Sequence, residues 1–173
     1  MKTLRVIPPV CLLISLGRLL SGKLRFSRSF LNQEVKSADD RQYIIFRHIM
    51  IHPQSMGSDT CVFVVSFRFA HLSHKANKLA SLIPMLLIAG FPGFMQKIYA
   101  VDPESGYWSG MYQWRSENDL KAYQKSLVYR MMNKRAVKGS VTSLIMPYSS
   151  LNDYIKKQTI IQYQKQLNKK SKS

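Results

Sequence analysis

The stretch that decides the fold runs from residue 95 to residue 115 and reads MQKIYAVDPESGYWSGMYQWR. Its two halves are rich in the β-branched and aromatic residues that favour strands, and the central Asp-Pro-Glu-Ser-Gly segment is typical of a turn. The stretch therefore predicts a β-hairpin, with strands over residues 95–101 and 107–115.

A strand and a helix are expected before this hairpin. Residues 60–70 form a nearly continuous apolar run, which is typical of a buried strand. A helix is predicted to begin after Ser73 and to end at Gly90, with apolar residues at helical spacing. Pro84 lies inside that pattern, and we expect it to kink or restart the helix.

A helix and a strand are also expected after the hairpin. Ser116 and Asp119 form a capping box, and apolar residues at helical spacing continue to Met131. A final strand is expected over residues 141–147. The order strand-helix-strand-strand-helix-strand over residues 59–155 predicts an α+β, ferredoxin-like βαββαβ fold, with a four-stranded antiparallel sheet and both helices on one face.

The second face of such a sheet has no helix to cover it. On the strand over 107–115, Trp108, Tyr112 and Trp114 point to one side, and Tyr107 and Met111 point to the other. Neither side has the polar character of a surface that faces water. Solvent, the N-terminal extension or a second subunit could cover the second face. We expect a homodimer whose two facing sheets enclose an apolar intersheet cavity.

The net charge of +17 looks like a nucleic-acid signature, but its distribution argues against one. Residues 1–58 carry +6, residues 59–155 carry +5 and residues 156–173 carry +6. Basic ends around a mildly basic middle indicate attraction to an anionic membrane surface or added solubility, whereas a nucleic-acid partner is not favoured. Residues 156–173 are expected to form a basic C-terminal tail.

Residues 1–23 form an apolar and basic N-terminal segment. Its apolar stretch is too short to span a bilayer as a helix, and it lacks a good cleavage site for a signal peptide. Leu12, Leu16 and Leu19 share one helical stripe, so a helix that lies in the lipid headgroups is expected, with a cap on the domain's own apolar surface as the alternative. The favoured localisation is cytoplasmic and membrane-associated, rather than secreted.

Residues 24–58 are expected to be a linker with one added strand, over residues 43–52. His48 and His52 have a spacing that would suit a metal site on a helix. Because this segment is predicted to be a strand, a metal site there is not favoured. Cys11 and Cys61 form neither a disulfide framework nor a cysteine-rich zinc motif.

From about residue 59 to residue 155 the sequence resembles the dimeric α/β-barrel superfamily, and within it the YdhR-type monooxygenases. The resemblance lies in residues 91–97 (FPGFMQK), the hairpin through Gly106, residues 110–114 (GMYQW) and residues 119–123 (DLKAY). It implies a homodimer and a monooxygenase that oxidises a hydrophobic aromatic small molecule in the intersheet cavity, generally without metal or flavin.

Candidate site residues follow from this resemblance. His71 and His74 are the candidate catalytic bases, because they follow the first strand at the mouth of the barrel. The candidate substrate-binding residues are aromatic: Phe67, Phe69, Trp108, Tyr112 and Trp114. A haem-dependent or haem-degrading enzyme is less favoured, and its axial ligand would be His71 or His74.

A binding module is the competing reading. The sequence shows no clear acid–base constellation, which favours a non-catalytic protein of the same fold that holds an apolar ligand and docks on membranes through its basic ends.

Overall fold

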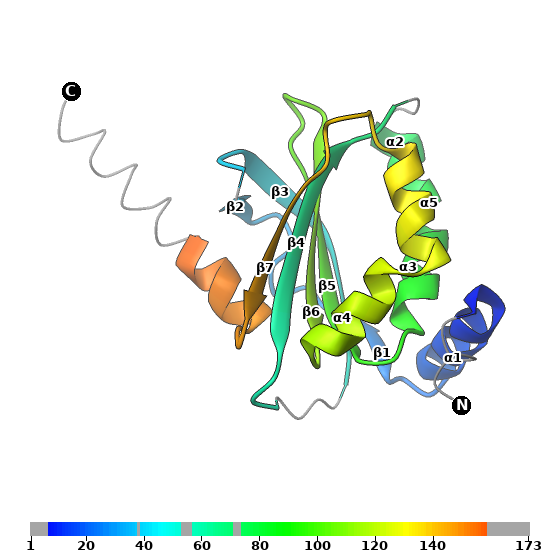
Figure 1. Cartoon of the computed structure of the whole chain (residues 1–173). Coiled ribbons are helices and arrows are strands. Elements are labelled where there is room, and N and C mark those ends of the chain that lie inside the picture. Colours follow the sequence, from blue (N-terminus) through cyan, green and yellow to red (C-terminus); the bar gives the residue numbers. More distant parts are fainter. Residues whose placement is uncertain (1–6, 38, 53–56, 71–73, 159–173) are drawn as a thin grey trace, which may run out of the picture.

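The computed structural model describes residues 7–37, 39–52, 57–70 and 74–158, without the side chains of His74 and Lys75. Its centre is four antiparallel strands: β4 (Cys61–Arg68), β5 (Phe94–Val101), β6 (Tyr107–Trp114) and β7 (Thr142–Pro147). They lie side by side in the order β5-β6-β4-β7 in an open sheet (Figure 1). This strand order is that of a ferredoxin-like domain, and the predicted α+β fold class is confirmed.

Four short helices cover one face of the sheet, where two longer ones were expected (Figure 1). They are α2 (His74–Ala80), α3 (Leu82–Ala89), α4 (Glu117–Gln124) and α5 (Leu127–Arg135). The first expected helix restarts after Ser81, which places Pro84 in the first turn of α3, where a missing N–H costs no intrahelical hydrogen bond. Ser73 lies outside the described residues.

The second expected helix is divided because two serines cap it in turn. The Ser116 hydroxyl oxygen accepts a hydrogen bond from the backbone N–H of Asp119 at 3.2 Å, as the capping box predicts. Ser126 accepts from the N–H of Tyr129 at 3.2 Å and so begins α5. A serine can cap a new helix or lie within a continuous one. The spacing of apolar residues therefore did not predict the break between α4 and α5.

The segment before β4 is more structured than a linker. The expected added strand is β3 (Gln42–Ile51), which pairs with β5. Two further strands, β1 (Leu24–Phe26) and β2 (Glu34–Lys36), pair with the far side of β3. Between them, Asn32 and Ser27 donate backbone hydrogen bonds to the carbonyls of Ile45 and His48. Each short strand has only three residues and buries one apolar side chain, which is too weak a pattern to predict.

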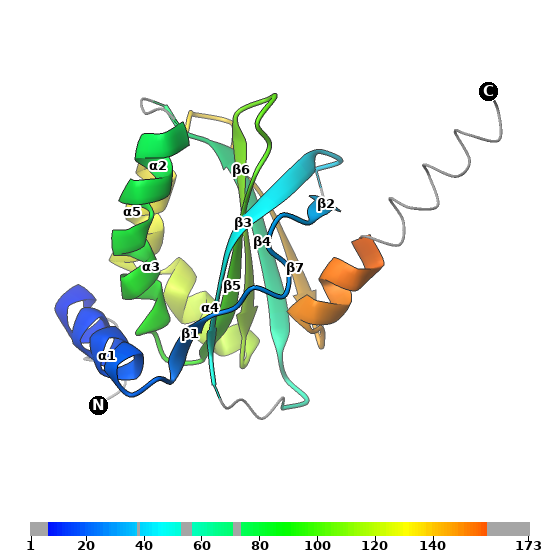
Figure 2. The same cartoon turned by 180° about the vertical axis from the view of Figure 1, so that it is seen from behind.

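Helix α1 (Pro8–Leu20) packs on α3 (Figure 2). Cys11 and Ser15 are buried in this contact, and the Arg18 guanidinium donates to the carbonyl oxygen of Ala89. A Cβ at Gly90 would lie 1.8 Å from the backbone oxygen of Cys11, so the two segments meet at backbone distance. The segment forms the cap on the domain's own surface that the sequence left as an alternative. Every helix among the described residues is too short or too polar to cross a bilayer.

The face of the sheet opposite the helices is partly covered by the chain itself (Figure 2). Val35 and Tyr43 from the N-terminal extension, together with Leu151 and Ile155 from the helical residues 151–158, form a second apolar cluster with the sheet. We expected a second copy of the chain to seal this face. The chain's own segments take up part of that role, and the homodimer stays a prediction. Most of the expected C-terminal tail lies outside the described residues.

Candidate functional site

A cavity of about 290 Å³ lies between the sheet and its helices. The helix wall comes from α3 and α5 and includes Ile83, Leu87, Met131 and Met132. The sheet wall is mostly aromatic and includes Phe67, Phe69, Lys97, Tyr99, Trp108 and Tyr112. An apolar cavity of this size with few polar groups is the usual kind of small-molecule site.

Ring contacts fix the shape of the aromatic wall. Phe69 lies at its centre, with ring centroids 4.9 Å from Phe67 and 5.3 Å from Trp108, both near edge-to-face. Phe46 of β3 packs against the other side of Trp108 at 5.2 Å, also edge-to-face. These are favoured arrangements for aromatic pairs, so the wall is held by neighbouring rings as well as by the sheet.

The structure brings four of the five predicted aromatic residues to this cavity, but on the other face of the sheet from the one expected. Phe67, Phe69, Trp108 and Tyr112 face the chain's own helices. These four residues therefore line a cavity within one chain. A cavity between two facing sheets needs a second copy of the chain, and it stays a prediction. Strand alternation separates two faces but does not say which face the helices will cover.

Trp114 is the predicted aromatic residue that does not line the cavity. It is fully buried and stacks on Tyr123 at 5.0 Å between centroids. His71 lies outside the described residues, and His74 begins α2 without a described side chain. The structure therefore leaves the expected bases untested.

Lys97 is the cavity residue that the sequence reasoning missed. It projects from β5 among rings, is 5 % exposed, and has its Nζ 3.9 Å from the ring centroid of Tyr99 and 4.3 Å from that of Tyr112. No hydrogen bond or ion pair to Lys97 is formed within the described part of the chain. Among the described lining residues there is no carboxylate. The available signal was its place two residues before Tyr99, on the same face of the predicted strand. That strand lies at the edge of the predicted four-stranded sheet and becomes internal because β3 pairs with it.

Burial lowers the pKa of Lys97 well below its ordinary value, and the nearby Arg47 guanidinium acts in the same direction. Arg47 is held in place by its hydrogen bonds to the Ser81 hydroxyl at 2.7 Å and the Lys78 carbonyl at 3.0 Å. The two ring faces attract a desolvated ammonium ion by about 2 kcal/mol or more, which offsets part of the lost hydration. The folded protein therefore favours the neutral amine more strongly than water does.

The tyrosines around the amine are poor proton acceptors. Burial raises the pKa values of Tyr99, Tyr112 and Tyr123 above their ordinary range, so all three stay protonated at neutral pH. The Tyr99 hydroxyl has no hydrogen-bond partner among the described residues. The site thus combines a free amine and an unpartnered hydroxyl with an aromatic wall.

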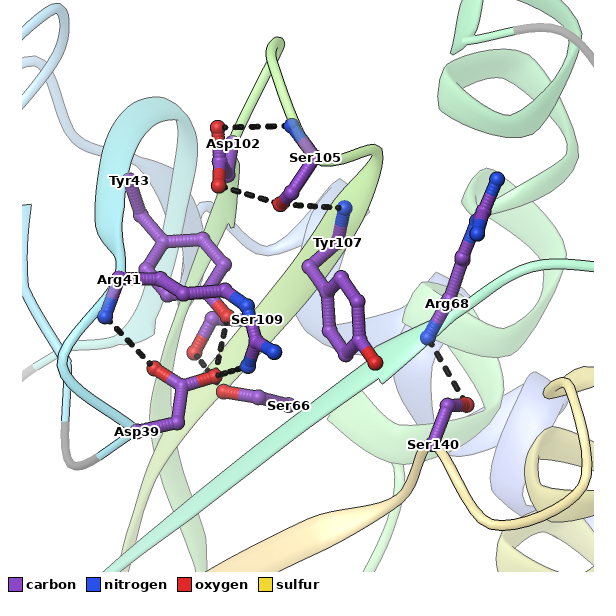
Figure 3. A network of polar contacts seen from close by, with 10 residues as sticks. All are labelled: Asp39, Arg41, Tyr43, Ser66, Arg68, Asp102, Ser105, Tyr107, Ser109 and Ser140. Carbon is purple, nitrogen blue, oxygen red and sulfur yellow. Dashed lines mark hydrogen bonds and ion pairs between the residues drawn. The ribbon is translucent and has the colours of Figure 1, made fainter.

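The opposite face of the sheet carries a polar network (Figure 3). The Tyr43 hydroxyl donates to Asp39 at 2.6 Å, and the Arg41 guanidinium donates to the same carboxylate at 2.9 Å while stacking on the Tyr107 ring. Asp39 also lines a second cavity of about 290 Å³. Its carboxylate is already satisfied, which makes this cavity the weaker candidate. Arg68, at the end of β4, is not among the described residues that line the aromatic cavity.

Within the described part of the chain there is no group of three or more potential metal ligands. The described lining of the aromatic cavity has no histidine or cysteine that could ligate haem iron, and its volume is at the small end for ligand pockets. The predicted axial ligands, His71 and His74, have no described side chains, so the haem alternative stays a prediction.

Comparison with known proteins gives structural similarities at low identity. No protein-family model matches the chain, and no curated protein matches it. A Listeria monocytogenes ferredoxin-fold protein related to antibiotic biosynthesis monooxygenases is 11% identical, with a TM-score of 0.48 over 79% of this chain and 88% of that one. The haem-degrading enzyme LmHde from the same species is 14% identical, with a TM-score of 0.47 over 78% and 92%.

A third similar structure is the Streptomyces coelicolor monooxygenase from the gene ActVA-Orf6, solved with nanaomycin D. It is 20% identical, with a TM-score of 0.40 over 54% of this chain and 90% of that one. Such values concern the general fold, and they do not transfer a substrate, a cofactor or a residue role to this chain.

Proposed function

We propose that this protein is a monooxygenase that binds a hydrophobic aromatic phenol in the helix-side cavity and oxidises it with O₂. The observation that carries the proposal is an aromatic-walled cavity of about 290 Å³ with an unpaired, buried amine in its wall. The resemblance of residues 59–155 to YdhR-type monooxygenases points the same way, and membership of that subfamily is part of the proposal.

Lys97 supplies the proton acceptor in this mechanism. Its neutral Nζ takes the phenol proton, and the resulting phenolate is electron-rich enough to give an electron to O₂. For an anthrone the whole reaction balances without another reductant: the ring methylene becomes a carbonyl, the substrate loses four electrons, and the second oxygen atom leaves as water. The rings orient the substrate and exclude bulk water.

His71 and His74 stay the predicted alternative bases, since neither side chain is described. Single alanine variants at the two positions distinguish them from Lys97, because only the base that accepts the phenol proton should change the acid limb of the rate profile.

Oxygen uptake with anthrone or a hydroquinone tests the proposal, with protein-free solution as the blank. We expect Lys97→Met to lower the protein-dependent rate by about a hundred-fold or more, the usual effect of removing a general base. Lys78→Met is the matched control, because the Lys78 amine lies 4.9 Å from the Phe46 ring centroid but outside the cavity lining. Equal rates for wild type and Lys97→Met would refute the role of this amine.

A non-catalytic binding protein is the second candidate, favoured by the lack of a described acid partner for Lys97. It predicts that a naphthol quenches the fluorescence of Trp108, which lines the cavity, while anthrone causes no oxygen uptake above the blank. Turnover above the blank would exclude it.

We also propose that α1 attaches the protein to an anionic membrane surface. The outer side of this helix exposes Leu13 by 69%, Leu16 by 39% and Leu20 by 89%, while its inner side is packed on α3. Exposed leucines close to basic residues favour the headgroup region of a bilayer. The support is this exposed apolar side together with the basic residues near it in the sequence.

A further inference from the structure

The lysine in the cavity wall has chemistry that phenol oxidation does not use. A neutral primary amine is a nucleophile, and here it lies at the edge of an apolar cavity without a hydrogen bond or counter-ion in the described residues. Surface lysines have the same amine, but they are protonated at neutral pH and surrounded by water. Lys97 differs from them in position and surroundings.

We propose that Lys97 is a covalent carbonyl-binding site, whose Nζ condenses with an apolar aromatic aldehyde or ketone in the cavity to form an imine. This goes beyond the proposed oxidation, since it needs no O₂ and no electron transfer. It uses the same cavity, so it rests on the part of the proposed function that places an aromatic ligand there.

The condensation balances within the amine and the carbonyl compound. The Nζ lone pair forms a C–N bond to the carbonyl carbon, and a proton moves from nitrogen to oxygen to give a carbinolamine. Loss of one water molecule then leaves the imine, with nothing oxidised or reduced. Water exclusion by the rings favours this dehydration.

The surrounding residues define the class of carbonyl compound. The rings of Phe67, Phe69 and Trp108 offer contact to a flat aromatic body on the same wall as the amine. The Tyr99 ring lies beside Nζ, at 3.9 Å from its centroid, and adds a further aromatic face next to the amine. A small aliphatic aldehyde would leave most of the cavity unfilled. The site therefore favours aromatic carbonyl compounds of about one to two rings.

Reductive trapping tests the inference on the full chain, without O₂, using naphthaldehyde and cyanoborohydride at about pH 6.5. At that pH only about one ordinary lysine amine in ten thousand is neutral. We expect one dominant adduct, with the mass of the aldehyde minus one oxygen atom, and peptide mapping should place it on Lys97. Labelling should fall at least about ten-fold in Lys97→Met and stay unchanged in Lys78→Met.

Three further measurements keep the outcomes distinct. Naphthol has the ring system without the carbonyl, so an excess should protect Lys97, and acetaldehyde should label it far more slowly. Thermal unfolding of Lys97→Met checks that the variant is folded. Naphthol binding without labelling of Lys97 would overturn the imine and leave the aromatic cavity standing. If naphthol did not bind and Lys97 were not labelled, the ligand site would be overturned as well. Labelling spread over exposed lysines would overturn the inference.

Discussion

Replacing Lys97 by methionine should make the protein more stable at neutral pH. Methionine keeps an unbranched chain of similar length and removes an amine that is buried without a hydrogen-bond partner in the described residues. Leaving such a polar group unsatisfied costs about 1–3 kcal/mol. For a chain of this size each kcal/mol moves the unfolding midpoint by about 2–4 °C. We therefore expect a gain of several degrees.

The pH dependence of this gain gives a stricter test. The pKa of Lys97 is lower in the folded protein than in the unfolded chain, where it is near the ordinary lysine value of 10.5. Between the two pKa values the unfolded chain binds one more proton, so stability rises with pH by up to about 1.4 kcal/mol per pH unit. Methionine does not titrate. Its advantage should therefore be greatest near neutral pH and shrink as the pH approaches the unfolded pKa.

Urea unfolding of wild type, Lys97→Met and Lys78→Met from about pH 7 to about pH 9.5 measures these free energies. Taking the difference between variants cancels the titration of the buried tyrosines, which all three proteins share. The free energy of unfolding of Lys78→Met should change with pH in the same way as that of wild type. If the Lys97→Met curve also ran parallel to wild type, the amine would be hydrated or charged in the folded protein, and the reasoning about the cavity would fail.

Three other predictions follow from separate contacts. Burial lowers the pKa of His48, so wild type should lose stability as the pH falls below about 6.5. His48→Gln should reduce this loss in thermal scans at several pH values, and equal slopes of midpoint against pH in the two proteins would contradict the prediction. Gly90→Ala should lower the free energy of unfolding, measured with urea, by about 1–3 kcal/mol and speed proteolysis near α1, because the new Cβ would lie 1.8 Å from a backbone oxygen of that helix. Unchanged digestion would show that α1 does not pack against Gly90. The double change Leu13→Gln and Leu20→Gln should weaken flotation with anionic vesicles without moving the thermal midpoint, and unaltered flotation would remove α1 as the attachment site.

The sequence allowed the central domain to be predicted because its local signals agreed with one another. The hairpin turn, the Ser116 cap and the apolar strand over residues 60–70 each pointed to the same order of elements. Strands β1 and β2 were missed because each buries a single apolar residue, Leu24 or Val35. The side of the sheet on which the cavity lies was missed because both sides of β6 are apolar.

The candidate site could be predicted in part. Aromatic residues at alternate positions marked a wall, and Phe67, Phe69, Trp108 and Tyr112 do share one. Lys97 was overlooked because a lysine in a strand usually reaches solvent, and its burial depends on helices α3 and α5 that close over it. The relation between those helices and β5 is a tertiary property that spacing along the chain does not reveal.

The pairing of β3 limits how copies of this chain can join edge to edge. On one side of the sheet β1, β2 and the backbone hydrogen bonds between them occupy the outer edge of β3 along most of its length. Among the described strands, β7 is left as the long free edge, with Leu144 and Ile145 about 40% exposed. Since the described sheet offers one such long edge, pairing through it joins two molecules and leaves no second long described edge for a third.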